Sequence, residues 1–181
     1  MNPLAIVTPI QRAAPAAFLI GLVILAVADA AKTWFGTTLG TSDNSELFGY
    51  LSMALFFLLV VFVSFLFINR RRDADRGIML FLLPVIVAAL VSMIASGILA
   101  VTVSIGLMGE YAESIGRDFQ TVAQDPAMQE DFQAWLEENT AMAQERLSPA
   151  AWVGFGGFWA VTFLFGFWFA SMKREDDETV A

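Results

Sequence analysis

The acidic residue Asp29 stands inside a long apolar stretch, and Lys32 follows it three residues later. Carboxylates within membrane-spanning segments are rare, and by default they suggest a functional role such as a proton or cation site. On a helix, however, two residues three apart share a face, so opposite charges there can pair. We therefore expect a local Asp29–Lys32 ion pair that anchors the helix near the membrane interface, with a proton or cation site as the alternative.

Small and hydroxyl-bearing residues recur every four positions in a later apolar stretch: Ala88, Ser92, Ser96, Ala100 and Ser104. A period of four keeps them near one face of a helix, where a second helix can approach closely. Each hydroxyl can donate to the carbonyl one turn back, so close packing is the favoured interpretation. A polar path through the membrane, lined by Ser92, Ser96 and Ser104, is the alternative.

A pair of glycines, Gly156-Gly157, lies between aromatic residues of the last apolar stretch. Because glycine has no side chain, the backbone of a neighbouring helix can come close at this point. A flat lipophilic ligand such as a quinone fits the same description. Ordinary helix packing is the favoured interpretation.

Two residue types that carry much protein chemistry are missing, because the chain has neither cysteine nor histidine. It therefore has no thiol nucleophile, no disulfide, and no imidazole to hold a metal or a haem. The formal net charge of −8 argues against a nucleic-acid partner, since phosphate contacts require basic residues. We expect no catalytic residue, no metal site and no cofactor.

Four apolar stretches position these residues, at 14–35, 47–68, 78–108 and 150–172. A hydrocarbon core about 30 Å thick requires about 20 helical residues, and each stretch is long enough. Hydrophobic residues make up 57% of the chain, above the share of about 45–50% in soluble domains. The sequence thus predicts an all-α polytopic membrane protein, in which four transmembrane helices form a bundle and a single membrane domain over residues 1–181.

Loop charges predict how these helices are oriented. Arg70–Arg72 and Arg76 lie between the second and third stretches, and Lys173-Arg174 follows the fourth. Since basic residues accumulate on the cytoplasmic side, both termini and the tail 173–181 are expected inside. The segment 109–149, with nine acidic residues against two arginines, is expected outside.

The N-terminal stretch has an alternative interpretation as a cleaved segment. Arg12, the apolar run 16–28 and the motif Ala28-Asp29-Ala30 resemble a secretory signal peptide. Cleavage would leave three transmembrane helices in the same orientation. We favour retention, because the apolar run continues to Trp34-Phe35, which are suitable interface anchors.

The outer segment 109–149 is expected to be helical. Its first helix would continue the third span to Ala123, and Asp125-Pro126 has the residue types of a helix N-cap and first turn. Ser148-Pro149 is expected to precede the last span. The middle helix has one apolar face, at Met128, Phe132, Trp135 and Leu136. Because the other faces are acidic, this apolar face should cover the outer end of the bundle, or alternatively dock a partner protein.

Three short motifs carry a family resemblance. They are Gly49-Tyr50-Leu51-Ser52-Met53, the turn from Arg70–Arg72 through Asp73 to Gly77, and Glu110-Tyr111-Ala112-Glu113. In these motifs the chain resembles an uncharacterised family of bacterial four-span membrane proteins, a domain of unknown function, over about residues 46–174. The resemblance implies the four-span architecture and a bacterial inner membrane, and it carries over no catalytic residue.

Three classes of function fit these expectations. The favoured class is a non-enzymatic accessory or interaction subunit of the bacterial inner membrane, whose partners are the lipid bilayer and a membrane protein or a second copy of the chain. The alternative is a small oligomeric transporter or channel that uses Asp29 and the serine face of the third span. A membrane enzyme acting on lipid is least favoured, because the chain has no Ser/His or Cys/His pair and no phosphate-binding loop.

Overall fold

The computed structural model describes residues 12–39, 45–74 and 78–172, and these residues are almost entirely helical. Four helices are long and apolar enough to cross a membrane: α2 (Pro15–Leu39), α3 (Ser45–Asp73), α4 (Leu82–Ser114) and α7 (Thr140–Ala170). Three shorter helices complete the order: η2 (Ile78–Phe81) before α4, then α5 (Phe119–Gln124) and α6 (Pro126–Glu138) between α4 and α7. The predicted all-α polytopic bundle is confirmed.

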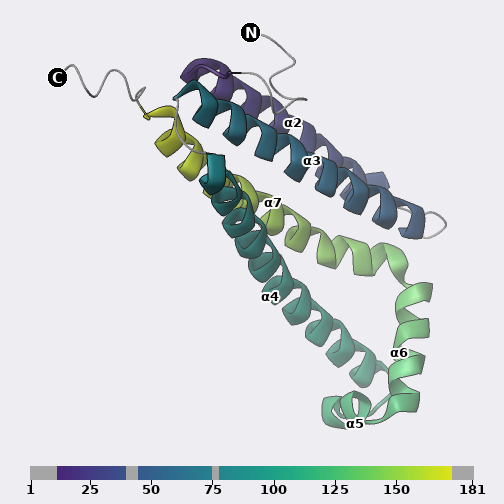
Figure 1. Ribbon diagram of the computed structural model, residues 1–181. Helices are drawn as coiled ribbons and strands as arrows, with labels where there is room; N and C mark the ends of the chain where they lie inside the picture. Colours follow the sequence, from purple (N-terminus) through teal and green to yellow (C-terminus); the bar gives the residue numbers. More distant parts are fainter. Residues whose placement is uncertain (1–11, 40–44, 75–77, 173–181) are drawn as a thin grey trace.

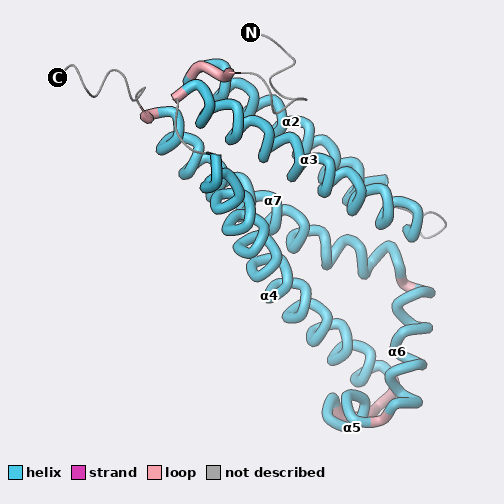
Figure 2. Tube along the Cα trace, viewed as in Figure 1, coloured by secondary structure: helices cyan, strands magenta, loops and turns pink. Residues whose placement is uncertain are grey.

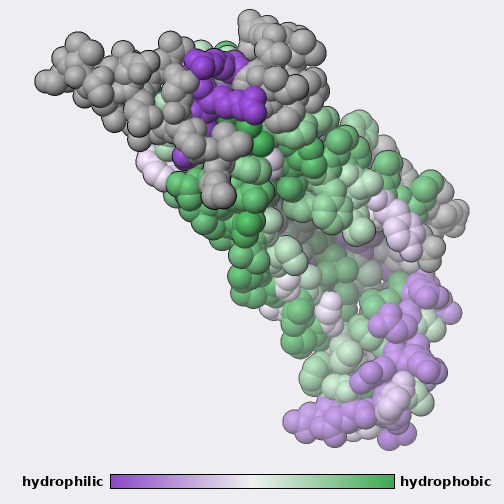
Figure 3. Space-filling model, viewed as in Figure 1, coloured by the Kyte–Doolittle hydropathy of each residue, from purple (hydrophilic) through white to green (hydrophobic). Residues whose placement is uncertain are grey.

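Helices α2 and α3 form an antiparallel pair, and α7 packs against both α2 and α4 (Figure 1). The short helices α5 and α6 lie at one end of α4, where α6 leads back to the start of α7 (Figure 2). Apolar residues cover most of the visible surface of α3 and α4, whereas hydrophilic residues gather over α5 and α6 and, at the opposite end of the bundle, near the end of α3 (Figure 3). A surface with this division suits a bundle in lipid with α5 and α6 beyond the lipid. We call these two helices and the turns that join them to α4 and α7 the polar cap.

Aromatic rings from three helices fill the core of the bundle. The ring of Phe67 in α3 meets Phe18 of α2 at 5.2 Å and Phe169 of α7 at 4.9 Å, both edge-on. Close approach depends on glycine, because a Cβ at Gly166 of α7 would lie 2.7 Å from Leu22 of α2. In lipid, tight contacts of this kind supply much of the energy of helix association.

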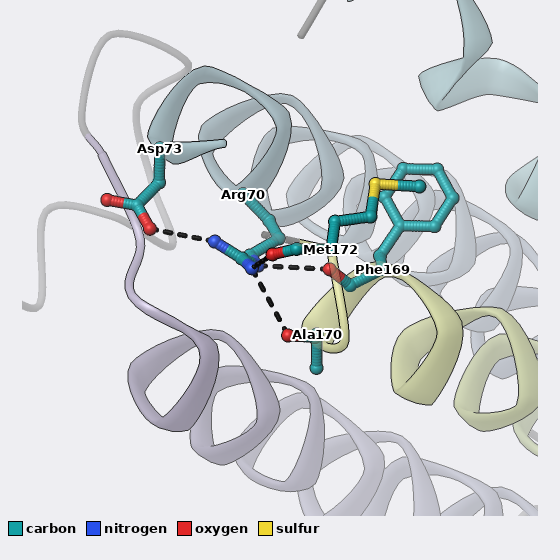
Figure 4. A network of polar contacts seen from close by, with 5 residues as sticks. All are labelled: Arg70, Asp73, Phe169, Ala170 and Met172. Atoms are coloured by element: carbon teal, nitrogen blue, oxygen red, sulfur yellow. Dashed lines mark hydrogen bonds and ion pairs between the residues drawn. The ribbon is translucent and has the colours of Figure 1, made fainter. Parts of the chain in front are cut away.

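Arg70, at the end of α3, joins that helix to the end of α7 (Figure 4). Its side chain is only 2% exposed. Its Nε donates to the Phe169 carbonyl at 3.0 Å, and its Nη2 donates to the carbonyls of Ala170, at 3.1 Å, and Met172. Nη1 pairs with Asp73 Oδ2 at 2.7 Å. The guanidinium thus binds carbonyls that the end of α7 leaves without helical partners. We call these contacts the Arg70 latch.

The polar cap differs from the sequence-based expectation at both of its ends. The third span was expected to continue to Ala123, but α4 ends at Ser114 and the chain turns at Gly116, whose φ of 65° suits glycine. Ser148-Pro149 was expected to precede the last span, but α7 begins at Thr140 and contains Pro149. The spans therefore extend beyond 78–108 and 150–172.

The middle of the cap agrees with its prediction. Asp125 caps α6, since its Oδ1 accepts from the Ala127 amide at 3.0 Å, and Pro126 is the first helical residue. The tail 173–181 lies outside the described residues, so its expected position stays a prediction.

Candidate ligand-binding cavity

Asp29 lies inside the bundle with two partners. Its carboxylate is 5% exposed, and its Oδ1 is 2.7 Å from Nζ of Lys32 one turn later on α2. Its Oδ2 accepts a hydrogen bond of 2.8 Å from the indole nitrogen of Trp159 on α7. The predicted Asp29–Lys32 ion pair is confirmed. The contact to Trp159 adds a link between helices that the local sequence pattern did not indicate.

Lys32 also faces an aromatic ring of a third helix. Its Nζ lies 5.6 Å from the ring centroid of Phe56 on α3, a distance at which a cation is attracted to the ring face. Phe56 in turn meets Phe158 of α7 edge-on at 5.7 Å. Side chains of α2, α3 and α7 therefore converge on one ion pair.

The serine face of α4 approaches the same region from the fourth helix. Ser92 Oγ donates to the Gly154 carbonyl of α7 at 2.8 Å, and Ser96 Oγ donates to the Ser92 carbonyl at 2.8 Å. A Cβ at Gly154 would lie 3.1 Å from Ser96 Cβ, and one at Gly157 would lie 3.6 Å from Ser92 Cα. The expected close packing is found at these residues, with one hydroxyl bonded across helices instead of one turn back.

Two predicted residues lie elsewhere. Ser104 is exposed, so the proposed polar path does not extend to it. Gly156 is exposed with no neighbour within 4 Å of a Cβ built there, whereas Gly157 makes the close approach to α4. Only one glycine of the pair therefore serves the predicted packing.

A cavity of about 410 Å³ lies between the four long helices, and we call it the polar cavity. Its polar lining comes from all four: Asp29, Lys32, Thr33, Thr37, Ser52, Ser92, Ser96 and Gln144. The aromatic residues Phe56, Phe155 and Phe158 form much of the remaining wall. A volume of this size is at the lower end of the range for small-molecule sites, which combine apolar walls with a few polar groups.

The predicted apolar face of α6 is used inside the molecule. Phe132 is buried, and Met128, Trp135 and Leu136 pack around it and around Tyr111 of α4. The ring of Tyr111 lies 5.6 Å from that of Phe132 and 5.7 Å from that of Trp135. Of the two sequence-based interpretations of this apolar face, the structure agrees with the one in which it covers the end of the bundle.

Several lining residues were not identified from the sequence. Thr33 and Thr37 follow Asp29 at intervals of four on α2, and this spacing was a usable signal for a polar face. Trp159 and Gln144 carry no comparable local signal, because they reach the site only through tertiary packing. Within the described residues, no three acidic groups are placed to hold a metal ion. The arrangement offers hydrogen bonds, one ion pair and aromatic surface to a molecule in the cavity.

Comparison with known proteins identifies no relative of this chain. No protein-family model, no curated protein and no solved structure matches the chain. The resemblance over residues 46–174 stays a prediction, and the site is interpreted from its own chemistry alone.

Proposed function

We propose that this chain is a non-enzymatic membrane protein of the bacterial inner membrane that binds a small ligand in the polar cavity, as a transporter or channel does. The observation that carries the proposal is the nearly buried Asp29–Lys32 ion pair, 2.7 Å long, on the wall of a cavity that also contains Ser92 and Ser96. Charged residues inside membrane spans are costly and mark ligand or ion sites by default.

A contribution to folding stability does not by itself explain a nearly buried ion pair such as Asp29–Lys32. Removing two charges from water costs several kcal/mol per ion, and the attraction between them often only balances that cost. Other polar groups line the same cavity as the ion pair, among them Thr33, one turn after Asp29 on α2, and Gln144 of α7. A helix anchor does not require these groups, whereas a binding site does.

The cavity lies towards the polar cap. Its lining residues come from the C-terminal half of α2, the start of α3 and the part of α7 from Gln144 to Phe158. Ser92 and Ser96, in the first half of α4, form the end of the cavity farthest from the cap. Under the proposed orientation, with residues 109–149 outside and both termini cytoplasmic, ligand enters from the outer side. The expected role as an accessory subunit stays a prediction, and the apolar face of α6 that it assigned to docking is packed against α4.

Single cysteines test the proposal directly, because the chain has none of its own. We expect Ser96→Cys, in the polar cavity, to react with a membrane-impermeant thiol reagent added on the outer side. Ile98→Cys is the matched control. Ile98 lies about 3 Å from Ser96 along the axis of α4, is exposed, and does not line the cavity. A thiol there faces lipid, where the reactive thiolate does not form.

Two results would contradict the proposal. One is labelling of Ser96→Cys no faster than that of Ile98→Cys. The other is labelling of Ser96→Cys only from the side opposite the cap, which would overturn the outward opening of the cavity. Ala151→Phe should slow labelling of Ser96→Cys by filling the cavity, whereas Ala160→Phe, on the exposed side of α7, should not.

A further inference from the structure

Three side chains on the wall of the polar cavity have no hydrogen-bond partner within the described residues: Thr33 of α2, Ser52 of α3 and Gln144 of α7. Thr33 is only 9% exposed, and the space that its hydroxyl lines is the cavity. Polar groups inside a protein are normally hydrogen-bonded, and each one that is not calls for an explanation. A molecule bound in the cavity would supply the missing partners.

The serine face of α4 adds hydrogen-bond acceptors to the same wall. Ser92 and Ser96 each donate their hydroxyl hydrogen to a backbone carbonyl, so towards a ligand their oxygens keep only acceptor capacity. Lys32 adds donors, since its ammonium has three N–H groups and pairs with one carboxylate oxygen in the described residues. A ligand that satisfies all these groups carries both donors and acceptors, as hydroxyl groups do.

The ion pair itself disfavours a charged ligand. Asp29 Oδ1 is buried against Lys32, and Oδ2 accepts from Trp159, so neither oxygen is open to an ammonium group. An anion at Lys32 would share one ammonium with Asp29, and burial strengthens the repulsion between two negative charges. An uncharged ligand avoids both costs, and its hydroxyl oxygens can still accept from Lys32.

Aromatic rings form the apolar part of the cavity wall, at Phe56, Phe155 and Phe158. The face of an aromatic ring carries partial negative charge, so the C–H groups of a sugar ring, which are partly positive, pack well against it. The cavity volume of about 410 Å³ lies at the lower end of the range of about 300–1,000 Å³ for small-molecule sites. The cavity therefore suits a ligand of monosaccharide size.

We propose that the polar cavity binds an uncharged polyol or monosaccharide. Hydroxyl groups of the ligand bond to Thr33, Ser52 and Gln144, and its C–H groups pack against the aromatic wall. Lys32 donates to one ligand hydroxyl, and Asp29 holds Lys32 in place. The inference rests on the proposed function and names the ligand class of the same site.

The experiment uses the full chain with Ser96→Cys in lipid vesicles and a methanethiosulfonate reagent, which does not react with amines. Glucose and sorbitol are the uncharged probes, and gluconate and glucosamine are charged probes of nearly the same size. Each solute is present on both sides of the vesicle membrane, so no osmotic gradient acts. We expect glucose or sorbitol to slow labelling about tenfold at about ten times its dissociation constant, because the free cavity becomes a minor species. The charged probes should leave labelling fast at the same concentration.

Removing one unpartnered hydroxyl should weaken the protection. Thr33→Val keeps the shape of the side chain and should raise the dissociation constant about two- to tenfold, the effect of one lost hydrogen bond. Thr38→Val is the matched control, because Thr38 is exposed on the same helix and does not line the cavity. Ser52→Ala removes a hydroxyl from α3, so the test does not depend on one variant folding. Circular dichroism and gel filtration confirm that each variant is folded before labelling.

Three outcomes would overturn the polyol proposal while leaving the cavity proposal intact. They are no protection by glucose or sorbitol, protection by gluconate or glucosamine as strong as by the uncharged probes, or unchanged dissociation constants in both folded hydroxyl variants. Failure of Ser96→Cys to label in the absence of solute, by contrast, contradicts the open cavity itself, and the polyol proposal with it. The two proposals therefore fail by different measurements.

Discussion

The Arg70 latch predicts an unequal effect of two neighbouring arginines. Arg70→Met keeps a long side chain but removes every donor that now reaches the carbonyls of Phe169, Ala170 and Met172. Arg72, two residues later, is exposed, and Arg72→Met removes the same formal charge. Any effect of charge on membrane orientation is therefore matched between the two variants.

The magnitude follows from the contacts that Arg70→Met removes. A hydrogen bond to a charged donor contributes about 1.5–3 kcal/mol, and removing one partner of a buried ion pair costs about 3–5 kcal/mol. These terms overlap, because the same guanidinium makes all the contacts, so we expect a loss of about 3–5 kcal/mol. For a chain of this length, 1 kcal/mol corresponds to about 2–4 °C in melting temperature, which gives a fall of about 6–20 °C.

Thermal unfolding in a mild detergent, followed by circular dichroism, measures this fall. Arg72→Met should melt within about 2 °C of the wild type, as surface substitutions do. Arg70→Lys should lie between the two, because an ammonium keeps the charge but lacks the planar fork that reaches several acceptors. Equal melting temperatures for Arg70→Met and Arg72→Met would refute the view that the buried guanidinium holds α3 and α7 together.

Four further substitutions, one of them a control, test three other contacts. Gly154→Ala should cost about 1–3 kcal/mol by pushing α4 from α7, whereas Gly156→Ala, in open space, should be neutral or stabilising in the same melting assay. Phe132→Ala should speed amide hydrogen exchange in α6 while the long helices stay protected, because it leaves a cavity in the apolar cluster that joins α6 to Tyr111 of α4. Hydrogen bonds from Thr121 lower the pKa of the Asp118 carboxyl below its ordinary value of 3.8, so this cap stabilises α5 above that pH and is lost as the pH falls through the lowered pKa. Thr121→Val should raise the pKa of Asp118 in an NMR titration, and an unchanged value would contradict the assignment.

The architecture could be predicted because membrane helices follow local rules. Apolar length alone locates four spans, and Asp125-Pro126 marks the start of α6 correctly. Pro149 failed as a boundary because tertiary packing overrides a local signal there. The turns before it pack against the cap, where Ala143 is buried in the same apolar cluster as Tyr111 and Phe132, so the helix continues through the proline.

Only the contacts of the site that lie within a single helix could be predicted from the sequence. Asp29 and Lys32 pair within a turn, so their spacing is sufficient to predict the contact. Trp159 is 130 residues away along the chain, and its hydrogen bond depends on how α7 packs against α2. The Arg70 latch was not predicted either, because it also depends on how two distant helices pack. In addition, a basic cluster after a span is already explained by membrane orientation.

The packing of α2 also bears on whether that helix is part of the working protein. Phe18 and Leu22 are fully buried against α3 and α7, and the Ala13 amide donates to the Asn69 carbonyl near the Arg70 latch. Cleavage at the motif Ala28-Asp29-Ala30 would remove both core residues and cut the helix beside its ion pair. The remaining spans would then expose the surface around Gly166 that Leu22 fills. The cavity wall would lose Asp29, and Lys32, Thr33 and Thr37 would stand on a remnant too short to span the membrane. The helix that resembles a signal peptide is therefore the one on which both the core and the candidate site depend.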